Sequence, residues 1–129
     1  MVTLNGYDFD YYEEFNSQGV EDYGYVDFWK EGDIMIRVYV DDFEIGTEYD
    51  DAPSSFNSNT GNIGYSSYSY DAVNDVMVYT EFVDPDENTY TKEQFLEEHT
   101  QMDESDLDKI IKDAEKYTKR AFKNWWEDQ

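Results

Sequence analysis

The chain has 129 residues, the size of one domain, and its 32 acidic and 9 basic residues give it a formal net charge of −23. So acidic a chain is not expected to bind nucleic acid directly, because it offers the phosphates no basic patch. The lack of cysteine excludes a disulfide framework, a zinc ribbon and a thiol nucleophile.

The sequence has no apolar run near the roughly 18 residues of a membrane span, and its start lacks the pattern of a signal peptide. We therefore expect a cytoplasmic protein with no membrane partner. The 13 Tyr, 8 Phe and 3 Trp residues predict a folded chain. Each can remove roughly 150–250 Å² from water on burial, which supplies a compact core despite the mutual repulsion of the acids.

The N-terminal part predicts a hairpin. Asn5-Gly6 follows the apolar residues 2–4 and is typical of a tight two-residue turn. Residues 7–12 then alternate, with Tyr7, Phe9 and Tyr11 on one face. Residues 13–22 are expected to form a loop.

The central part predicts further strands. Residues 23–29 form a second strand region, and 34–40 give the clearest strand, with four aliphatic residues on one face and Met35, Arg37 and Tyr39 on the other. Residues 52–70 are rich in Ser, Asn and Tyr and are expected to form a long loop, with a polar-aromatic strand at its far end. Residues 76–83 predict a strand that ends before Pro85.

The C-terminal part predicts two helices. Thr91 with Gln94 has the form of a capping box and opens a short helix that runs to about His99. Ser105 with Asp108 is expected to open a long helix, because apolar residues recur at spacings of three and four from 107 to 125.

These elements predict the α+β class: an antiparallel sheet of about four to six strands with a short helix and a long C-terminal helix packed on one face. We expect a single acidic domain over 1–129, mainly β over 1–90, with the Ser/Asn/Tyr-rich segment 52–70, and helical over 91–129.

No pattern in the sequence predicts catalysis, a cofactor or a metal site. His99 has no nucleophile to form a dyad or triad with and is interpreted as a polar residue at a helix end. Residues 84–88 begin like a calcium loop, but Thr89 replaces the required Gly and Phe95 the bidentate Glu, so a strand-to-helix turn is expected. Adjacent carboxylates are interpreted as solvated runs. We expect a protein that is not an enzyme.

The remaining signal is the placement of acids beside aromatic residues. Residues 1–100 hold 24 acidic and 3 basic residues, a net charge of −21. Binding surfaces enrich aromatic side chains, which supply contact area at low entropic cost. Acids at i and i+2 on a strand lie about 6.6 Å apart and form rows of charge. The candidate partner-binding residues form a first cluster of Glu13, Glu14, Glu21 and Asp22, and a second cluster of Asp41, Asp42, Phe43, Glu44, Glu48, Tyr49, Asp50 and Asp51, in which Phe43 and Tyr49 are the expected aromatic anchors.

In these features the chain resembles the phage-encoded DNA-mimic inhibitors, namely anti-CRISPR and anti-restriction proteins and inhibitors of uracil-DNA glycosylase. The resemblance is one of class: small, cysteine-free, very acidic, α+β, with acids interleaved with Tyr and Phe. It implies a stoichiometric inhibitor that occupies the basic DNA or RNA cleft of its target, with a CRISPR effector nuclease as the expected partner. Segment 52–70 departs from the character of such mimics.

Two alternatives remain open. Immunity proteins, which neutralise basic nuclease toxins, share the same electrostatics and differ in partner. An acidic structural domain adapted to high salt needs no partner, because a run of charge is commonly a solvated face.

Overall fold

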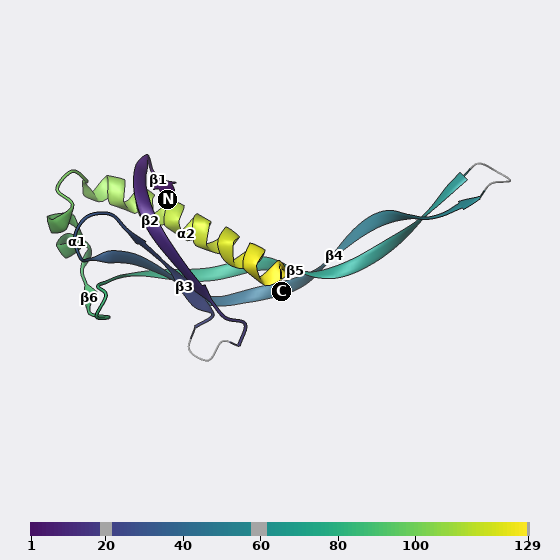
Figure 1. The fold of residues 1–129 in the computed structure, drawn as a ribbon, viewed down its shortest axis with the longest axis horizontal. Helices are drawn as coiled ribbons and strands as arrows, with labels where there is room; N and C mark the ends of the chain where they lie inside the picture. Colours follow the sequence, from purple (N-terminus) through teal and green to yellow (C-terminus); the bar gives the residue numbers. More distant parts are fainter. Residues whose placement is uncertain (19–21, 58–61, 129) are drawn as a thin grey trace.

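The computed structural model describes residues 1–18, 22–57 and 62–128, and the side chains of all of these except 48–57 and 62–69. Across the described residues, six antiparallel strands form one sheet in the order β1-β2-β3-β4-β5-β6, followed by two helices. The fold class is therefore the α+β class that the sequence predicts. In Figure 1 the long helix α2 lies along one face of the sheet.

The first hairpin forms as predicted. β1 (Val2–Leu4) pairs with β2 (Tyr7–Phe15), with Leu4 opposite Tyr7. Asn5 and Gly6 between them both have positive φ, at 49° and 82°, which a type I′ turn requires. β2 runs to Phe15, so the expected loop at 13–22 is wrong over its first three residues. Those residues pair with β3 (Gly24–Trp29). Backbone hydrogen bonds to β3 therefore extend the strand beyond the residues at which polar and apolar side chains alternate.

The centre of the sheet is a long hairpin. β4 (Met35–Asn57) and β5 (Asn62–Val83) pair along their whole length, with register shifts at Val40/Asp42, Glu44/Ile45 and Pro53/Ser55. Figure 1 shows the hairpin extending beyond the end of α2 as a two-stranded ribbon. β6 (Thr89–Tyr90) closes the sheet against β5.

The loop expected over 52–70 is wrong for residues 52–57 and 62–64, whereas the polar-aromatic strand expected at its far end is confirmed, because Tyr65, Tyr68 and Tyr70 lie on β5. Residues 52–57 belong to β4 and 62–70 to β5. Ser, Asn and Gly have low strand propensity, so local composition favours a loop. The proximal ladder between β4 and β5 has already set the register, however, and each further pair adds hydrogen bonds without a new loop to close.

Both helices begin with a capping box. In α1 (Lys92–Glu98) the box joins Thr91 and Gln94, as predicted, and His99 is the C-cap. α2 (Glu104–Glu127) begins before the predicted position, because its box joins Asp103 and Asp106 rather than Ser105 and Asp108. The Asp103 carboxylate accepts the Asp106 N–H at 2.7 Å, which satisfies one of the free donors of the first turn.

The core lies between α2 and the sheet. Its larger cluster joins Phe9, Phe28 and Ile36 of the sheet to Leu107 and Ile110 of α2. A smaller cluster at the far end of α2 is built around Phe122, with Val40, Val73 and Val76. The predicted apolar stripe of α2 is thus the face that packs on the sheet.

Asp84 organises the turn after β5. Its carboxylate accepts the N–H groups of Asp86 and Asn88, both at 2.9 Å, the Asn88 side-chain amide at 3.0 Å, and the Tyr90 hydroxyl. The turn expected to lead from a strand into a helix instead joins β5 to the short strand β6, and it is built around one buried carboxylate. These hydrogen bonds, led by the one from Tyr90, lower the pKa of Asp84 to about 2.

Substituting Asp84→Asn is expected to destabilise the protein in a pH-dependent way. The pKa of Asp84 is depressed in the folded state, so its contribution is present above the unfolded pKa near 3.8 and is lost as pH falls towards 2. Urea unfolding should show the wild type more stable than the variant at pH 5–7, with a gap that narrows below about pH 4. A gap that is constant from pH 7 to pH 2 would contradict this role.

Candidate protein-binding face

The face of the sheet away from α2, called here the open face, carries tyrosines and charged residues. Strand alternation places Val26, Ile36 and Val38 under α2 and turns their neighbours outwards. Cross-strand pairing then sets these outward residues side by side, since Glu14 is opposite Tyr25 and Asp27 is opposite Arg37. The residues of the open face discussed below are Glu14, Tyr25, Asp27, Arg37, Tyr39, Asp42, Glu44, Tyr79 and Glu81, together with Asp22, which accepts the Tyr79 hydroxyl.

A buried ion pair lies at the centre of the open face. Arg37 Nε and Nη2 donate to the two Asp27 oxygens at 2.6 and 3.0 Å, and Nη1 donates to Glu87. Arg37 and Asp27 are each only 5% exposed. The hydrogen bonds to Asp27 raise the pKa of Arg37 further above its usual value, so the guanidinium stays charged.

Three tyrosines surround this pair. The Arg37 guanidinium lies 4.1 Å from the centre of the Tyr25 ring, a cation–π contact. The Tyr39 and Tyr79 rings stack with centroids 4.8 Å apart. Tyr39 also meets Tyr25 edge to face. The aromatic surface is therefore fixed by contacts within the sheet.

Two of these tyrosines hold carboxylates. Tyr25 donates its hydroxyl to Glu14 at 2.6 Å, and Tyr79 donates to Asp22 at 3.1 Å. The hydrogen bond to Glu14 raises the pKa of Tyr25, while burial and then the hydrogen bond to Asp22 raise the pKa of Tyr79 to about 12. Both phenols are thus neutral donors at physiological pH, and they orient two negative charges.

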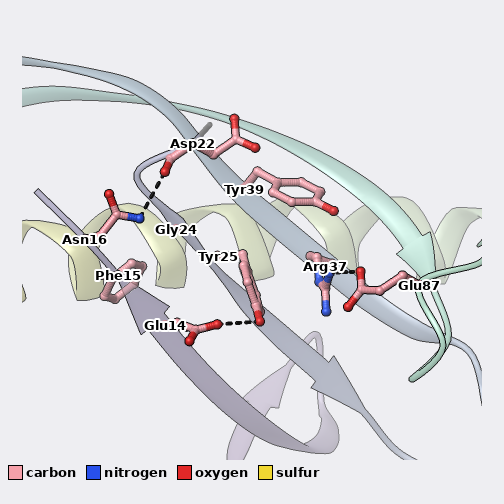
Figure 2. A pocket seen from close by; sticks show the side chains of 9 residues that line it. All are labelled: Glu14, Phe15, Asn16, Asp22, Gly24, Tyr25, Arg37, Tyr39 and Glu87. Atoms are coloured by element: carbon pink, nitrogen blue, oxygen red, sulfur yellow. Dashed lines mark hydrogen bonds and ion pairs between the residues drawn. The ribbon is translucent and has the colours of Figure 1, made fainter. Parts of the chain in front are cut away.

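A pocket of about 530 Å³ opens between these groups and the ends of β2 and β3. Figure 2 shows Tyr25 joined to Glu14, and Arg37 beside Glu87. Gly24 in the pocket lining has φ +119°, and a Cβ there would lie 2.1 Å from the Glu14 carbonyl oxygen. Only glycine lets β2 and β3 approach this closely at the pocket.

The structure divides the first predicted cluster between two faces. Glu14 and Asp22 lie together at the pocket on the open face. Glu13 points to the other side, where its carboxylate accepts the Tyr117 hydroxyl of α2 at 2.7 Å. Glu21 lies outside the described residues.

The second predicted cluster is divided as well. Asp42 and Glu44 are exposed and flank Phe43 on the strand, so they lie on the face opposite to its ring. The Phe43 ring packs against Phe122 at 5.0 Å, which makes it part of the smaller core cluster rather than a free anchor. Asp41 is exposed at the bulge. The backbone of Glu48, Tyr49, Asp50 and Asp51 continues β4, and their side chains lie outside the description.

Sequence reasoning missed the centre of the open face. The sequence places Arg37 and Tyr39 on the second face of their strand, but no acidic cluster in the sequence includes them. Asp27, Tyr25 and Tyr79 join them only through strand pairing. One feature of the sequence could have predicted it, namely the lone arginine within the clearest strand. An arginine among apolar strand residues is expected to be buried, and a buried arginine is stable only when an acidic residue pairs with it.

His99 is buried at the end of α1, with its Nδ1 2.9 Å from the Phe95 carbonyl and its ring stacked on Phe95. This is the expected helix-end position. Within the described parts of the chain, no group of three or more His, Asp or Glu residues is placed to hold a metal ion. Nor does any described helix have the length and apolar character needed to cross a membrane.

Comparisons of the chain with family models, with curated proteins and with solved structures give no match.

Proposed function

We propose that this protein is a stoichiometric inhibitor that presents its open face as an acidic DNA mimic and occupies the basic nucleic-acid cleft of an enzyme. CRISPR effector nucleases are the first targets to assay. The observation that carries the proposal is the pairing of oriented carboxylates with fixed tyrosine rings on the face of the sheet away from α2.

The carboxylates of the open face form a row of negative charge along β4. Asp42 and Glu44 are two residues apart on β4, about 6.6 Å along the strand, and adjacent strands are about 4.8 Å apart. Duplex DNA presents one charge per about 1.7 Å of axis over its two strands. The carboxylates therefore resemble a phosphate backbone in sign and in their linear arrangement, at a wider spacing, and the sheet holds them on a rigid frame.

The tyrosines supply what a charged surface alone lacks. A basic cleft holds Arg and Lys side chains, which bind carboxylates through charge-assisted hydrogen bonds and stack on aromatic faces. Tyr25, Tyr39 and Tyr79 are already fixed by mutual contacts, so binding costs little side-chain entropy. Charge then governs the rate of association, while the desolvated contacts govern the lifetime.

Charge reversal on the open face tests the proposal. The triple variant Asp42→Lys, Glu44→Lys, Glu81→Lys is expected to weaken inhibition by about 100-fold or more, because like charges would face the cleft. The matched control reverses three exposed acids away from this face, Glu31→Lys, Glu93→Lys, Glu97→Lys, and should inhibit almost like the wild type. The assay adds protein at stoichiometric ratio to guide-loaded effector nucleases and labelled target DNA.

Two results would overturn the proposal. One is DNA binding by every nuclease at unchanged affinity in the presence of the wild-type protein. The other is equal inhibition by the open-face variant and the control, which would place the contact elsewhere on the molecule.

A further inference from the structure

The outer side of α2 carries a basic stripe in this otherwise acidic chain. The chain has nine basic residues, and six of them lie on α2. At 100° per residue these six fall within an arc of about 100° on the side opposite to the buried face. The stripe consists of Lys109, Lys112, Lys116, Lys119, Arg120 and Lys123.

The stripe is accessible and little neutralised by its own chain. All its members are exposed except Lys123, which is half-buried. Lys123 is also the one member of the stripe that forms an ion pair with another described residue, Glu127, at 3.4 Å. Its C-terminal part lines a groove of about 450 Å³ between α2 and the bulge of β5 at Asn74 and Asp75. The expectation that the chain has no basic patch is therefore wrong, because helical periodicity gathers its few cations on one line.

We propose that the basic stripe of α2 binds the open face of a second copy of this protein. The two surfaces are complementary in charge, since the stripe presents cations and the open face presents Glu14, Asp22 and Glu81. They also match in length. The stripe spans about 21 Å at 1.5 Å per residue, and β4 from Arg37 to Glu44 spans about 23 Å at 3.3 Å per residue.

The tyrosines of the open face favour a second copy over a nucleic-acid strand as the partner of the stripe. Lys and Arg side chains on a helix would find both carboxylates and aromatic rings there, whereas a phosphate backbone supplies charge alone. Repulsion between the two acidic molecules is screened over a Debye length of about 8 Å at physiological ionic strength. The attraction between the stripe and the open face, which lie in contact, therefore outweighs the repulsion between more distant acids.

The arrangement of the two surfaces dictates the form of assembly. The open face and the basic stripe lie on opposite sides of the sheet–helix layer, so one copy cannot use both toward the same partner. The contact is heterologous, and each added copy leaves one open face and one stripe free. Self-association would thus cover the face that the proposed function uses, although it does not depend on that function.

Sedimentation velocity over a concentration series tests the proposal. We expect species larger than the monomer at about 100 mM salt and their loss at about 0.5 M, where the Debye length shortens to a few ångströms. Neutralising the stripe with Lys112→Gln, Lys116→Gln, Lys119→Gln should weaken association by on the order of tenfold or more. The control Thr100→Glu, Gln101→Glu, Ser105→Glu changes the net charge equally at exposed positions outside the stripe and should still associate.

Mixing two defective variants gives the sharpest test. The open-face variant Glu14→Gln, Asp22→Asn, Glu81→Gln keeps its stripe, and the stripe variant keeps its open face. Each alone should be monomeric, and their equimolar mixture should form a dimer that does not grow. A monomeric wild type at every concentration, or a mixture with no dimer, would overturn the proposal.

Two further measurements distinguish self-association through the stripe from nucleic-acid binding by the stripe and from a role of the stripe in inhibition. A labelled single-stranded DNA that binds the wild type and not the stripe variant, without self-association, would assign the stripe to nucleic acid and overturn the proposal. Inhibition of the target enzyme by the stripe variant at wild-type strength would support a stripe that serves only self-association. Loss of inhibition in that variant, with self-association intact, would contradict the assignment.

Discussion

Replacing Phe122 by alanine is expected to lower the free energy of unfolding by about 3–5 kcal/mol, the range for deleting a buried phenylalanine. Phe122 is fully buried and joins the end of α2 to β2 and β4 through edge-to-face contacts with Phe15 and Phe43. Its loss would leave a cavity where three strands meet the helix. Urea unfolding followed by circular dichroism measures the change.

The control for Phe122 is Ile45→Ala on the same hairpin. Ile45 is 52% exposed, so its truncation should change stability by no more than about 0.5–1 kcal/mol. Equal losses in the two variants would show that the smaller cluster is not a core and that the apolar stripe of α2 ends before Phe122.

Replacing Arg37 by methionine is expected to cost about 3–5 kcal/mol of stability, because it leaves the buried Asp27 carboxylate without its cation. Both side chains are below one-tenth exposed, and the bidentate contact satisfies both Asp27 oxygens. The same change removes the cation under the Tyr25 ring. Chemical unfolding at neutral pH gives the loss directly.

The double variant Asp27→Leu, Arg37→Met distinguishes the stability lost by leaving Asp27 unpaired from the stability lost by removing the packing of the Arg37 side chain. Replacing a buried ion pair by apolar residues of similar volume is often neutral, so much of the lost stability should return. Lys92→Met is the control, since Lys92 pairs with the exposed Asp108 and should contribute about 0–1 kcal/mol. A double variant as unstable as Arg37→Met alone would show that the arginine acts through its packing and not through the acid.

Local patterns were sufficient for much of the fold. The Asn5-Gly6 turn, the Thr91 capping box and the alternation at residues 34–40 each depend on neighbours in sequence, and each appears in the structure. The long ribbon of β4 and β5 was not predictable in this way. Its strand character over 52–57 and 62–64 comes from pairing across the hairpin, in a composition that favours turns, whereas only its Tyr-rich end was expected to form a strand.

The residue types of the candidate site were predictable from the sequence, but the face of the sheet on which each residue lies was not. The sequence pointed to acids beside aromatic residues, and Glu14, Asp42 and Glu44 do lie on the open face. The same run of acids could not reveal that Glu13 binds Tyr117 on the helix side. Neighbouring strand residues point to opposite faces, so an acidic cluster in sequence is divided in two by the sheet.

The sequence by itself determined the charge, the class of fold and the face of α2 that is buried, because composition and periodicity are local properties. Only the tertiary structure decided that Asp27 meets Arg37, that Phe43 joins the core, and that the tyrosines of three strands form one surface. Strand register sets these contacts, and register couples residues far apart in the chain through backbone hydrogen bonds that no local pattern encodes.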